Sequence, residues 1–352
     1  MKIAYIDYSF HKKTGSTLFF QEILRHGNNV HTFWDDYLND VRNLKYKEIN
    51  EQKFDLIVFF QIIPPFNFIK KLDCKNIIWV PMHDSERKTN FFEWLKYFSL
   101  NIKIISFSST LSKKLKYIGF CKLDVKYYPP ISLINNINFK KIKLFFWQRN
   151  NDITWDKLKK ILPLENIEQV ILKASPDPSY KLLLPSKEDC DNHNIKIIDG
   201  WISKEDYNFF LKDSNLYIAS RCYEGIGMGF LEAMSRGIPV LAPNYPTMNE
   251  YIDDGKNGFL YNPKKLQKKD FKDISNISKT IIRDMQKGFD KWNIQKKEIE
   301  QFVKKSPKVD NLNHGILLHI IIRVYELIIK PFEYLKNLIK KIRENLNNNT
   351  NI

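Results

Sequence analysis

Apolar, β-branched and aromatic runs alternate along this chain with segments whose apolar residues recur at helical spacing. Such runs, when bounded by polar or turn-forming residues, predict buried strands. In the first part of the chain, strands are predicted at residues 2–8, 55–60, 76–80 and 103–107, and helices at 17–25, 90–98 and 110–118. Strands that alternate with helices in this way form a parallel sheet with helices on both faces.

The alternation stops at Pro129 and Pro130 and then begins again. Two consecutive prolines continue neither a helix nor a central strand, so a domain boundary is expected within residues 131–138. Beyond it, strands are predicted at residues 142–147, 169–174, 195–199, 215–220 and 240–242, and helices at 153–162, from 204 and up to 236. The expected fold is α/β, with two doubly wound, Rossmann-like domains and a helical tail, at residues 1–134, 135–290 and 291–352.

The last part of the chain, from about Ile277, is predicted to be helical and basic. Residues 316–345 hold long apolar runs, but charged side chains interrupt them, and no uncharged stretch approaches the roughly 20 residues of a spanning helix. The pattern predicts a pair of helices, bent at Pro331, that lies at a membrane surface. A helix that binds a partner or packs on the protein itself is the alternative.

The formal net charge of +16, with lysine pairs throughout the chain, widens the range of partners. Nucleic acid, an anionic membrane surface and a phosphorylated substrate are all compatible with it, as is a lysine-rich surface without such a partner. The four cysteines lie far apart without a C-x-x-C pair, which argues against a zinc site and fits a reduced cytoplasmic protein. The first residues are typical of a strand rather than of an export signal.

The most informative stretch is residues 221–240, RCYEGIGMGFLEAMSRGIPV, which follows one predicted strand and contains a helix. Its glycines let the backbone approach a ligand, and the helix start offers free N–H groups to a phosphate. Glu232, expected in the first turn of the helix, can accept ribose hydroxyls, and Glu224 can accept sugar hydroxyls. Together they indicate a nucleotide sugar. A favourable helix-start acid and a tight glycine turn are the plainer alternatives.

Glu224 and Glu232 also match the E-x7-E motif of retaining glycosyltransferases with the GT-B fold, and the stretch resembles glycosyltransferase family 4 in particular. The similarity continues through LEAMSRGIPVLAP and MNEYIDDGKNGFLYNP and is strongest over residues 200–263. It implies two domains that face a cleft, the N-terminal one for the acceptor and the C-terminal one for the donor. It also implies transfer without a metal or other cofactor, in which the donor's own phosphate helps to deprotonate the acceptor.

The same resemblance assigns roles to particular residues. It implies that Glu224 holds the transferred sugar, that Glu232 holds the ribose, and that Ile202 lies near the nucleobase. Backbone groups that contact the donor are expected at Gly225, Ile226, Gly227 and Met228.

The family also places an Arg, and a Lys several residues later, at the start of the donor domain, where they neutralise the leaving diphosphate. Arg149 follows a predicted strand and suits the first role, because a fixed cation stabilises the charge that grows as the glycosidic bond breaks. A surface cation is the alternative for it. Thr154 and Trp155 occupy the spacing expected for the Lys. Lys157 lies nearby, and whether it takes that role stays open.

Two residues of the N-terminal half complete the predicted site. Gly15 follows the first strand, where its backbone is expected to approach the donor phosphate from across the cleft. His83 follows another strand and is expected to contact the sugar or the acceptor, with a solvated loop histidine as the alternative.

Other patterns carry less weight. Asp189 and Asp191 form a D-x-D pair of the kind that binds a divalent metal, but they precede a strand instead of following one, so no metal site is expected. No G-x-G-x-x-G follows the first strand, and no zinc, RNP or helix-turn-helix signature is present. These points disfavour a nicotinamide dehydrogenase and a nucleic-acid-binding protein.

The sequence therefore predicts a cytoplasmic retaining glycosyltransferase, held peripherally at the inner face of the cytoplasmic membrane. Its expected catalytic residues are Glu224, His83 and Arg149. Its expected substrates are a nucleotide-diphosphate sugar and a lipid-linked or lipid-anchored glycan, as in the assembly of bacterial lipopolysaccharide or capsule. Another GT-B enzyme, such as an epimerase or a phosphorylase, and a basic nucleic-acid-binding protein are the alternatives.

Overall fold

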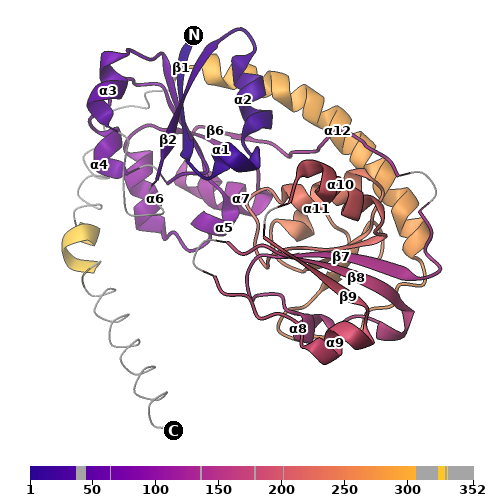
Figure 1. Ribbon diagram of the computed structural model, residues 1–352. Coiled ribbons are helices and arrows are strands. Elements are labelled where there is room, and N and C mark those ends of the chain that lie inside the picture. Colours follow the sequence, from indigo (N-terminus) through magenta and orange to yellow (C-terminus); the bar gives the residue numbers. More distant parts are fainter. Residues whose placement is uncertain are drawn as a thin grey trace.

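The chain folds into two six-stranded parallel sheets, each covered by helices (Figure 1). The structure is a computed structural model that describes residues 1–36, 45–63, 65–134, 137–177, 180–200, 202–306, 324–329 and 331. The composition of the central strands explains this architecture. In β3 (Leu56–Phe60) and β4 (Ile77–Val80), for example, every residue is buried, so both faces of the sheet must be covered.

The first sheet has the strand order β2-β1-β3-β4-β5-β6, and all neighbouring strands run parallel. The order reverses at β1, because β2 pairs with one edge of it and β3 with the other. Besides β3 and β4, this half of the chain contains β1 (Lys2–Tyr8), α1 (His11–Thr14), α2 (Leu18–Arg25), β2 (Asn29–Asp35), α3 (Tyr46–Glu51), α4 (Phe66–Ile69), α5 (His83–Glu86), α6 (Phe91–Phe98), β5 (Lys103–Ser106), α7 (Ser109–Ile118) and β6 (Lys122–Asp124).

The second sheet has the order β12-β11-β10-β7-β8-β9, and its order reverses between β7 and β10. Ligand crevices open at such reversals, beyond the carboxyl ends of the strands. This half contains β7 (Ile142–Gln148), α8 (Trp155–Leu158), η2 (Leu164–Asn166), β8 (Ile167–Ala174), α9 (Lys187–Asn192), β9 (Ile195–Asp199), α10 (Lys204–Lys212), β10 (Leu216–Ile218), α11 (Met228–Ser235), β11 (Val240–Pro243), η3 (Met248–Glu250) and β12 (Phe259–Tyr261).

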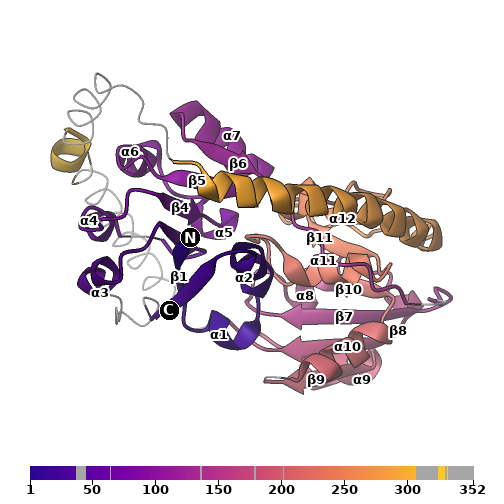
Figure 2. The same ribbon diagram turned by 90° about the horizontal axis from the view of Figure 1, so that it is seen from above.

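One long helix, α12 (Ile274–Lys304), connects the two halves by packing on α11 and on α2. Figures 1 and 2 show it running alongside both sheets. Trp292, in its middle, is buried among aromatic rings that include Phe107 of the first half. Near its end, Lys103 Nζ of β5 donates a hydrogen bond to Phe302 O at 2.9 Å. The helix passes residue 290 without a break, and the predicted domain limits stay a prediction.

The predicted fold class is confirmed, since two doubly wound parallel α/β units are present. Each predicted strand exists, but β2, β6 and β12 were missed. Most residues of β2, a strand at the sheet edge, are only partly buried, so its apolar pattern is weak, and β6 and β12 have three residues each. The helix predicted at residues 153–162 is only α8, because i→i−3 bonds such as that from Ile161 N to Leu158 O tighten the next turn.

The predicted pair of membrane-surface helices lies mostly outside the described residues. The described part includes a π-helical turn, η4 (Tyr325–Ile329), which docks on α6. The ring of Tyr325 stacks on Phe92 with centroids 4.6 Å apart, and its hydroxyl accepts a hydrogen bond from Asn90 Nδ2 at 2.7 Å. Leu327 and Ile328 are 71% and 55% exposed. Within the described ranges, no helix combines the length and the apolar character needed to cross a membrane.

Glu250 of the second half binds the N-terminus of α7 in the first half. Its carboxylate accepts hydrogen bonds from Ser109 N at 2.7 Å, from Thr110 N at 2.9 Å and from Ser108 Oγ at 2.8 Å. Burial alone pushes the pKa of Glu250 upward, but these hydrogen bonds outweigh burial and hold the pKa below its ordinary value. A carboxylate at a helix N-terminus is also favoured by the helix dipole. The ionised side chain therefore ties the two halves together.

We expect Glu250→Gln to lower the free energy of unfolding by about 1–3 kcal/mol at neutral pH, because charged hydrogen bonds are replaced by weaker ones. Since the folded-state pKa is lowered, the contribution of the carboxylate is complete above the ordinary value of 4.5 and is lost as pH falls through the lowered value. Chemical denaturation across this range checks both points. The exposed Glu205→Gln is the matched control, and an equal cost for the two variants at pH 7 would contradict the role of Glu250.

Candidate active site

The loop between β10 and α11 approaches the junction of the two halves, and its backbone is fixed from two sides. Gly227, the residue before α11, has φ +81°, and a Cβ there would lie 2.0 Å from Phe230 Cε1, so only glycine fits. Thr247 Oγ1 donates to Glu224 O at 2.7 Å and to Gly225 O at 3.2 Å. Because α11 begins as early as Met228, Glu232 is its fifth residue and lies beyond the first turn. The prediction that Glu232 lies in the first turn was therefore wrong.

The two glutamates of the motif are both partly buried. Burial raises the pKa of Glu224, and the positive charges of Arg221 and Arg149 oppose the rise. Burial likewise raises the pKa of Glu232, and Arg236 opposes it. Each carboxylate is thus a partly desolvated acceptor with cations nearby, an environment that strengthens hydrogen bonds from the hydroxyl groups of a bound ligand.

Arg149 lies directly after β7, at the reversal of the strand order, and its guanidinium is paired. Its Nη2 contacts Asp177 Oδ1 at 2.6 Å, and Arg221 Nη2 donates to the same oxygen at 2.9 Å. Burial lowers the pKa of Arg149, and the neighbouring charge of Arg221 adds to this, but an arginine stays ionised at neutral pH. Two fixed positive charges therefore lie beside Glu224.

His83 begins α5, directly beyond β4, and faces the same loop from the first half. Its ring lies 6.4 Å from that of Tyr223, measured between centroids. Burial lowers the pKa of His83, so the imidazole is neutral at pH 7. Within the described residues its Nδ1 is buried without a hydrogen-bond partner. The ring is thus able to exchange a hydrogen bond with a ligand in the junction.

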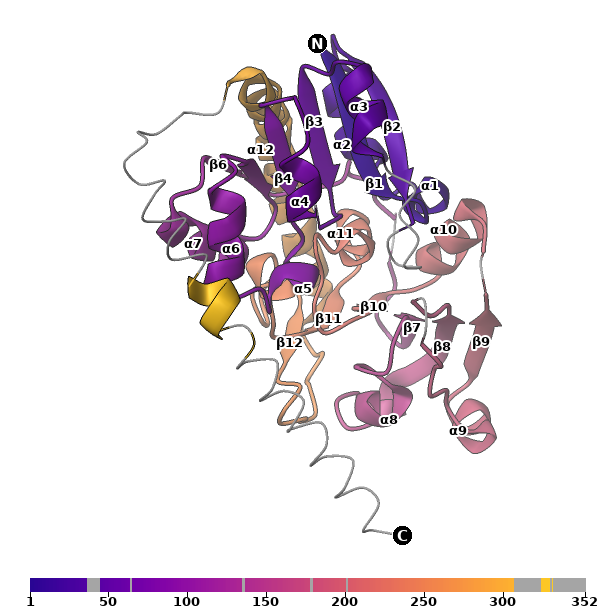
Figure 3. The ribbon, with the colours of Figure 1, turned by 90° about the vertical axis from the view of Figure 1, so that its left-hand side faces the viewer.

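The two halves are in direct contact here, as Figure 3 shows for α5 and the region of α11. A Cβ on Gly225 would lie 2.9 Å from Met82 Sδ and 3.0 Å from Met82 Cβ, so the absence of a side chain sets the closest approach. The guanidinium of Arg87 lies over the ring of Tyr223 at 4.0 Å, and the ring of Tyr245 also stacks on Tyr223, with centroids 4.9 Å apart. Small and flat groups therefore bring the two halves together at this point.

Gly15 and Ile202, both predicted to bind the donor, lie beyond the carboxyl ends of strands in different sheets. Gly15 ends α1, just after β1, with φ +67°, and α1 lies beside α10 in Figures 2 and 3. Ile202 is partly exposed between β9 and α10. Their roles stay predictions, as do those of Ile226, which is buried, and Met228, which is partly buried.

Lys157, the open candidate for the second diphosphate cation, is bound to its own loop. Its ammonium donates to Asn151 O at 3.2 Å and to Asp152 O at 2.8 Å. Thr154 and Trp155, which stand where the family has the Lys, are buried. This part of the site therefore departs from the pattern of glycosyltransferase family 4, which the sequence resembles.

The D-x-D pair lies in α9, away from these loops. Ser186 caps this helix by accepting a hydrogen bond from Asp189 N at 3.0 Å. The Asp189 carboxylate in turn accepts hydrogen bonds from Ser186 Oγ at 3.1 Å and from Lys159 Nζ at 3.0 Å. Among the described residues, no three His, Cys, Asp or Glu side chains gather into a metal-binding group.

Sequence reasoning missed several charged residues of the site, because they come together only in three dimensions. Asp84, which follows His83, lies 3.5 Å from Arg221 Nη1 across the junction. Lys173, in β8, is buried against the ring of Trp147 at 3.9 Å, and burial lowers its pKa to about 8. Arg221 carried a usable signal, since it follows β10 closely, as Arg149 follows β7.

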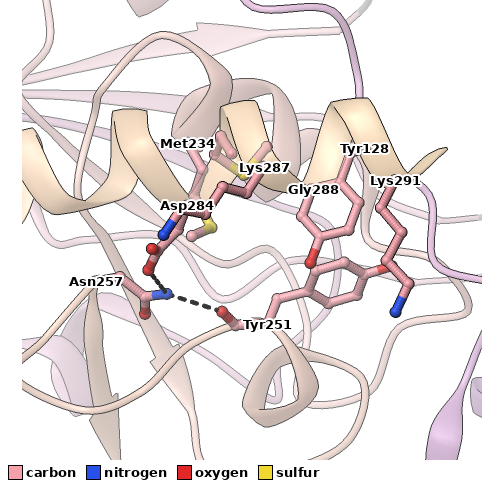
Figure 4. Close-up of a pocket in the computed structure, with 9 residues that line it drawn as sticks. Tyr128, Met234, Tyr251, Asn257, Asp284, Lys287, Gly288 and Lys291 are labelled. Carbon is pink, nitrogen blue, oxygen red and sulfur yellow. Dashed lines mark hydrogen bonds between the residues drawn. The ribbon is translucent and has the colours of Figure 1, made fainter. Parts of the chain in front are cut away.

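A separate pocket of about 290 Å³ lies where α12 crosses the segment between the two sheets (Figure 4). Tyr128, Tyr251 and two lysines of α12 line it, and Asn257 Nδ2 donates to Asp284 Oδ2 at 3.1 Å on one wall. None of the predicted site residues lines this pocket. It therefore lies apart from the loop of Glu224.

Comparison with known proteins bears on the class of this protein. Residues 185–280 match the family model of glycosyl transferases group 1. A 61-residue stretch, 17% of this chain, is 36% identical to sucrose synthase of Denitrovibrio acetiphilus, of which it covers 8%. A 93-residue stretch, 26% of this chain, is 29% identical to O-antigen chain mannosyltransferase B of Escherichia coli, of which it covers 21%.

A longer alignment of 187 residues, 53% of this chain, is 21% identical to an uncharacterized 41.2 kDa protein in the cps region of Klebsiella pneumoniae, of which it covers 48%. The chain thus spans about half or less of the length of the curated relatives described here.

Solved structures show the fold of most of the chain. Anabaena HepE in complex with UDP and glucose superposes with a TM-score of 0.56 at 15% identity, over 87% of this chain and all of the other. The lipopolysaccharide outer core galactosyltransferase WaaB, in its apo form, gives a TM-score of 0.53 at 15% identity, over 84% of this chain and all of the other. This chain therefore has the GT-B fold, and its match to glycosyl transferases group 1 supports a GT-B glycosyltransferase.

We expect Gly225→Ala to lower the free energy of unfolding by about 1–3 kcal/mol, because the added Cβ presses on Met82. The double variant with Met82→Ala should cost at least about 0.5 kcal/mol less than the two single variants together, since truncation of Met82 removes its Sδ, the atom closest to the added Cβ. Denaturant unfolding of the four proteins measures this coupling. Additive costs would show that Gly225 does not set the approach of the two halves.

Proposed function

We propose that this protein is a retaining glycosyltransferase that moves a sugar from a nucleoside diphosphate to a lipid-linked or lipid-anchored glycan. The observation that carries the proposal is the arrangement of Glu224, Arg149 and His83 around the junction, with Glu224 and Arg149 at the reversal of the second sheet. The GT-B fold and the family match over residues 185–280 support it. The similarity to an O-antigen mannosyltransferase and to a cps-region protein supports a role in bacterial surface polysaccharide biosynthesis.

In the proposed reaction, the bond between the sugar C1 and the diphosphate oxygen breaks, and the acceptor oxygen bonds to C1 on the same face. The proton of the acceptor hydroxyl passes to an oxygen of the departing diphosphate. Arg149 stabilises the negative charge that grows on that group, because a preorganised cation in a partly desolvated site needs little rearrangement as the bond breaks. The proposal needs no metal for this step.

The other residues of the site bind and orient the two substrates. Glu232 accepts hydrogen bonds from the ribose and Glu224 from the transferred sugar, while the backbone of residues 225–228 contacts the donor. Ile202 packs near the base, and Gly15 allows the first half to approach the phosphate. His83, neutral at pH 7, exchanges a hydrogen bond with the sugar or with the acceptor.

We further propose that the protein works at the inner face of the cytoplasmic membrane. The net charge of +16 favours anionic lipid, at about 1 kcal/mol for each well-placed cation. The exposed Leu327 and Ile328 of η4 add an apolar surface in the predicted tail. A lipid-linked acceptor would then reach the site from the same surface.

We expect the purified protein to show a higher melting temperature with one of UDP, GDP, ADP, dTDP and CMP, because a ligand at 100 times its dissociation constant adds about 2.7 kcal/mol of stability. Glu232→Ala should weaken that nucleotide roughly tenfold or more, through the loss of the ribose hydrogen bonds. Glu224→Ala should chiefly lower kcat, since its hydrogen bonds go to the transferred sugar. Thermal shift and sugar-transfer assays measure the two effects.

The exposed Glu205→Ala is the matched control for both glutamates. Wild-type rates of transfer in both Glu224→Ala and Glu232→Ala would rule out a carbohydrate role for the loop. A response to inorganic phosphate, with none to nucleotides, would support a phosphorylase instead.

We expect the double substitution Leu327→Glu with Ile328→Glu to reduce sedimentation with anionic vesicles roughly tenfold or more, because it removes apolar area and adds negative charge. The control is Leu183→Glu with Leu184→Glu, which changes two exposed leucines of the second half in the same way. Binding that stays unchanged in the first variant would show that this part of the tail is not the membrane contact.

A further inference from the structure

Two guanidinium groups share one carboxylate oxygen beside Glu224. Arg149 approaches Asp177 Oδ1 from the end of β7 and Arg221 from the loop after β10, at 2.6 and 2.9 Å. The two Nη2 atoms therefore lie no farther apart than the sum of these distances. The backbone reinforces this arrangement, because Asp177 N donates to Arg149 O at 2.9 Å. Asp177 thus holds both arginines at a fixed separation.

Each of these arginines keeps a donor that nothing in the described part of the chain accepts. The Nε atoms of Arg149 and Arg221 are both buried and without a hydrogen-bond partner among the described residues. A buried N–H group that has lost water and found no acceptor costs free energy. An anion that accepts from both groups recovers this cost, and a guanidinium fork matches phosphate oxygens better than an ammonium does.

The position of Arg221 indicates which phosphate it meets. It lies three residues before Glu224, whose carboxylate is within electrostatic reach of both arginines. Glu224 takes the transferred sugar in the proposed function, so the phosphate next to it is the distal one that carries the sugar. The helix α11 begins at Met228, after Glu224 in the sequence, whereas Arg221 precedes Glu224.

We propose that Arg221 is the second cation of the diphosphate site. Arg221 and Arg149, both paired with Asp177, form a two-arginine clamp that binds the distal phosphate of a nucleoside diphosphate. Lys157, which is hydrogen-bonded to Asn151 O and Asp152 O, takes no part in it. The inference rests on the proposed function, because it names the residue that performs one step of it. Arg149 and Arg221 follow β7 and β10, two strands that are neighbours in the sheet but not along the chain. In the glycosyltransferase family that the sequence resembles, both cations lie close together in the sequence, at the start of the donor domain.

Calorimetric titration of the full-length protein with nucleoside diphosphates and their monophosphates tests the clamp. The probes are UDP with UMP, GDP with GMP, and ADP with AMP, and the pair that the wild-type protein binds is used for the variants. Arg221→Met should weaken the diphosphate roughly 10- to 100-fold, because a charge-assisted fork is lost. Its affinity for the monophosphate should change by less than about threefold. Arg221→Lys, which keeps the charge and loses the fork, should fall between the two proteins.

Lys157→Met is the matched control and should bind both nucleotides as the wild-type protein does. If Arg221→Met binds the diphosphate normally, or if Lys157→Met loses it instead, the clamp is overturned and the proposed function stands. An equal loss of both nucleotides in Arg221→Met overturns the clamp as well, because it would show that Arg221 only supports the fold. If the wild-type protein binds none of the nucleotides, the proposed function fails and the clamp fails with it.

Discussion

The candidate site depends on the reversal of strand order between β7 and β10. These strands are neighbours in the sheet although the chain between them also forms β8 and β9. Right-handed connections that leave two neighbouring strands in opposite directions place their helices on opposite faces of the sheet. The carboxyl ends of the two strands therefore remain uncovered by either helix. Arg149 and the loop that starts at Arg221 occupy this opening, so the positive charges and Glu224 converge without any local sequence motif that contains all of them.

The first half of the chain supplies the opposite wall of the site, and several contacts define its distance. Met82 packs on the bare backbone of Gly225. Arg87 covers one face of Tyr223, and Glu250 reaches back to the N-terminus of α7. Together with α12, these contacts hold His83 opposite the loop of Glu224. These contacts respond differently to salt and to pH. The ionised carboxylate at the helix N-terminus depends on pH, whereas the apolar contact of Met82 does not.

Much of the architecture could be predicted because the central strands carry apolar residues on both faces. The runs at residues 55–60 and 76–80 have no other stable place than the middle of a covered parallel sheet. The prediction failed where this signal is weak. The β2 strand lies at an edge, where partial exposure allows histidine and threonine among its apolar residues. The start of α11 was placed two residues too late, since the helix begins directly after the left-handed Gly227 and includes Gly229.

The sequence by itself determined the alternation of strands and helices, the break at the two prolines and the glycine-rich loop between two glutamates, because each is a property of neighbouring residues. Only the tertiary structure decided that Arg221 shares a carboxylate oxygen with Arg149, and that Lys157 is bound to its own loop. Residues 149, 177 and 221 lie on three different loops, and their distances depend on the order and register of the strands that carry them. A pattern along the chain has no access to that order. The sheet sets it through hydrogen bonds between segments that are far apart in the sequence.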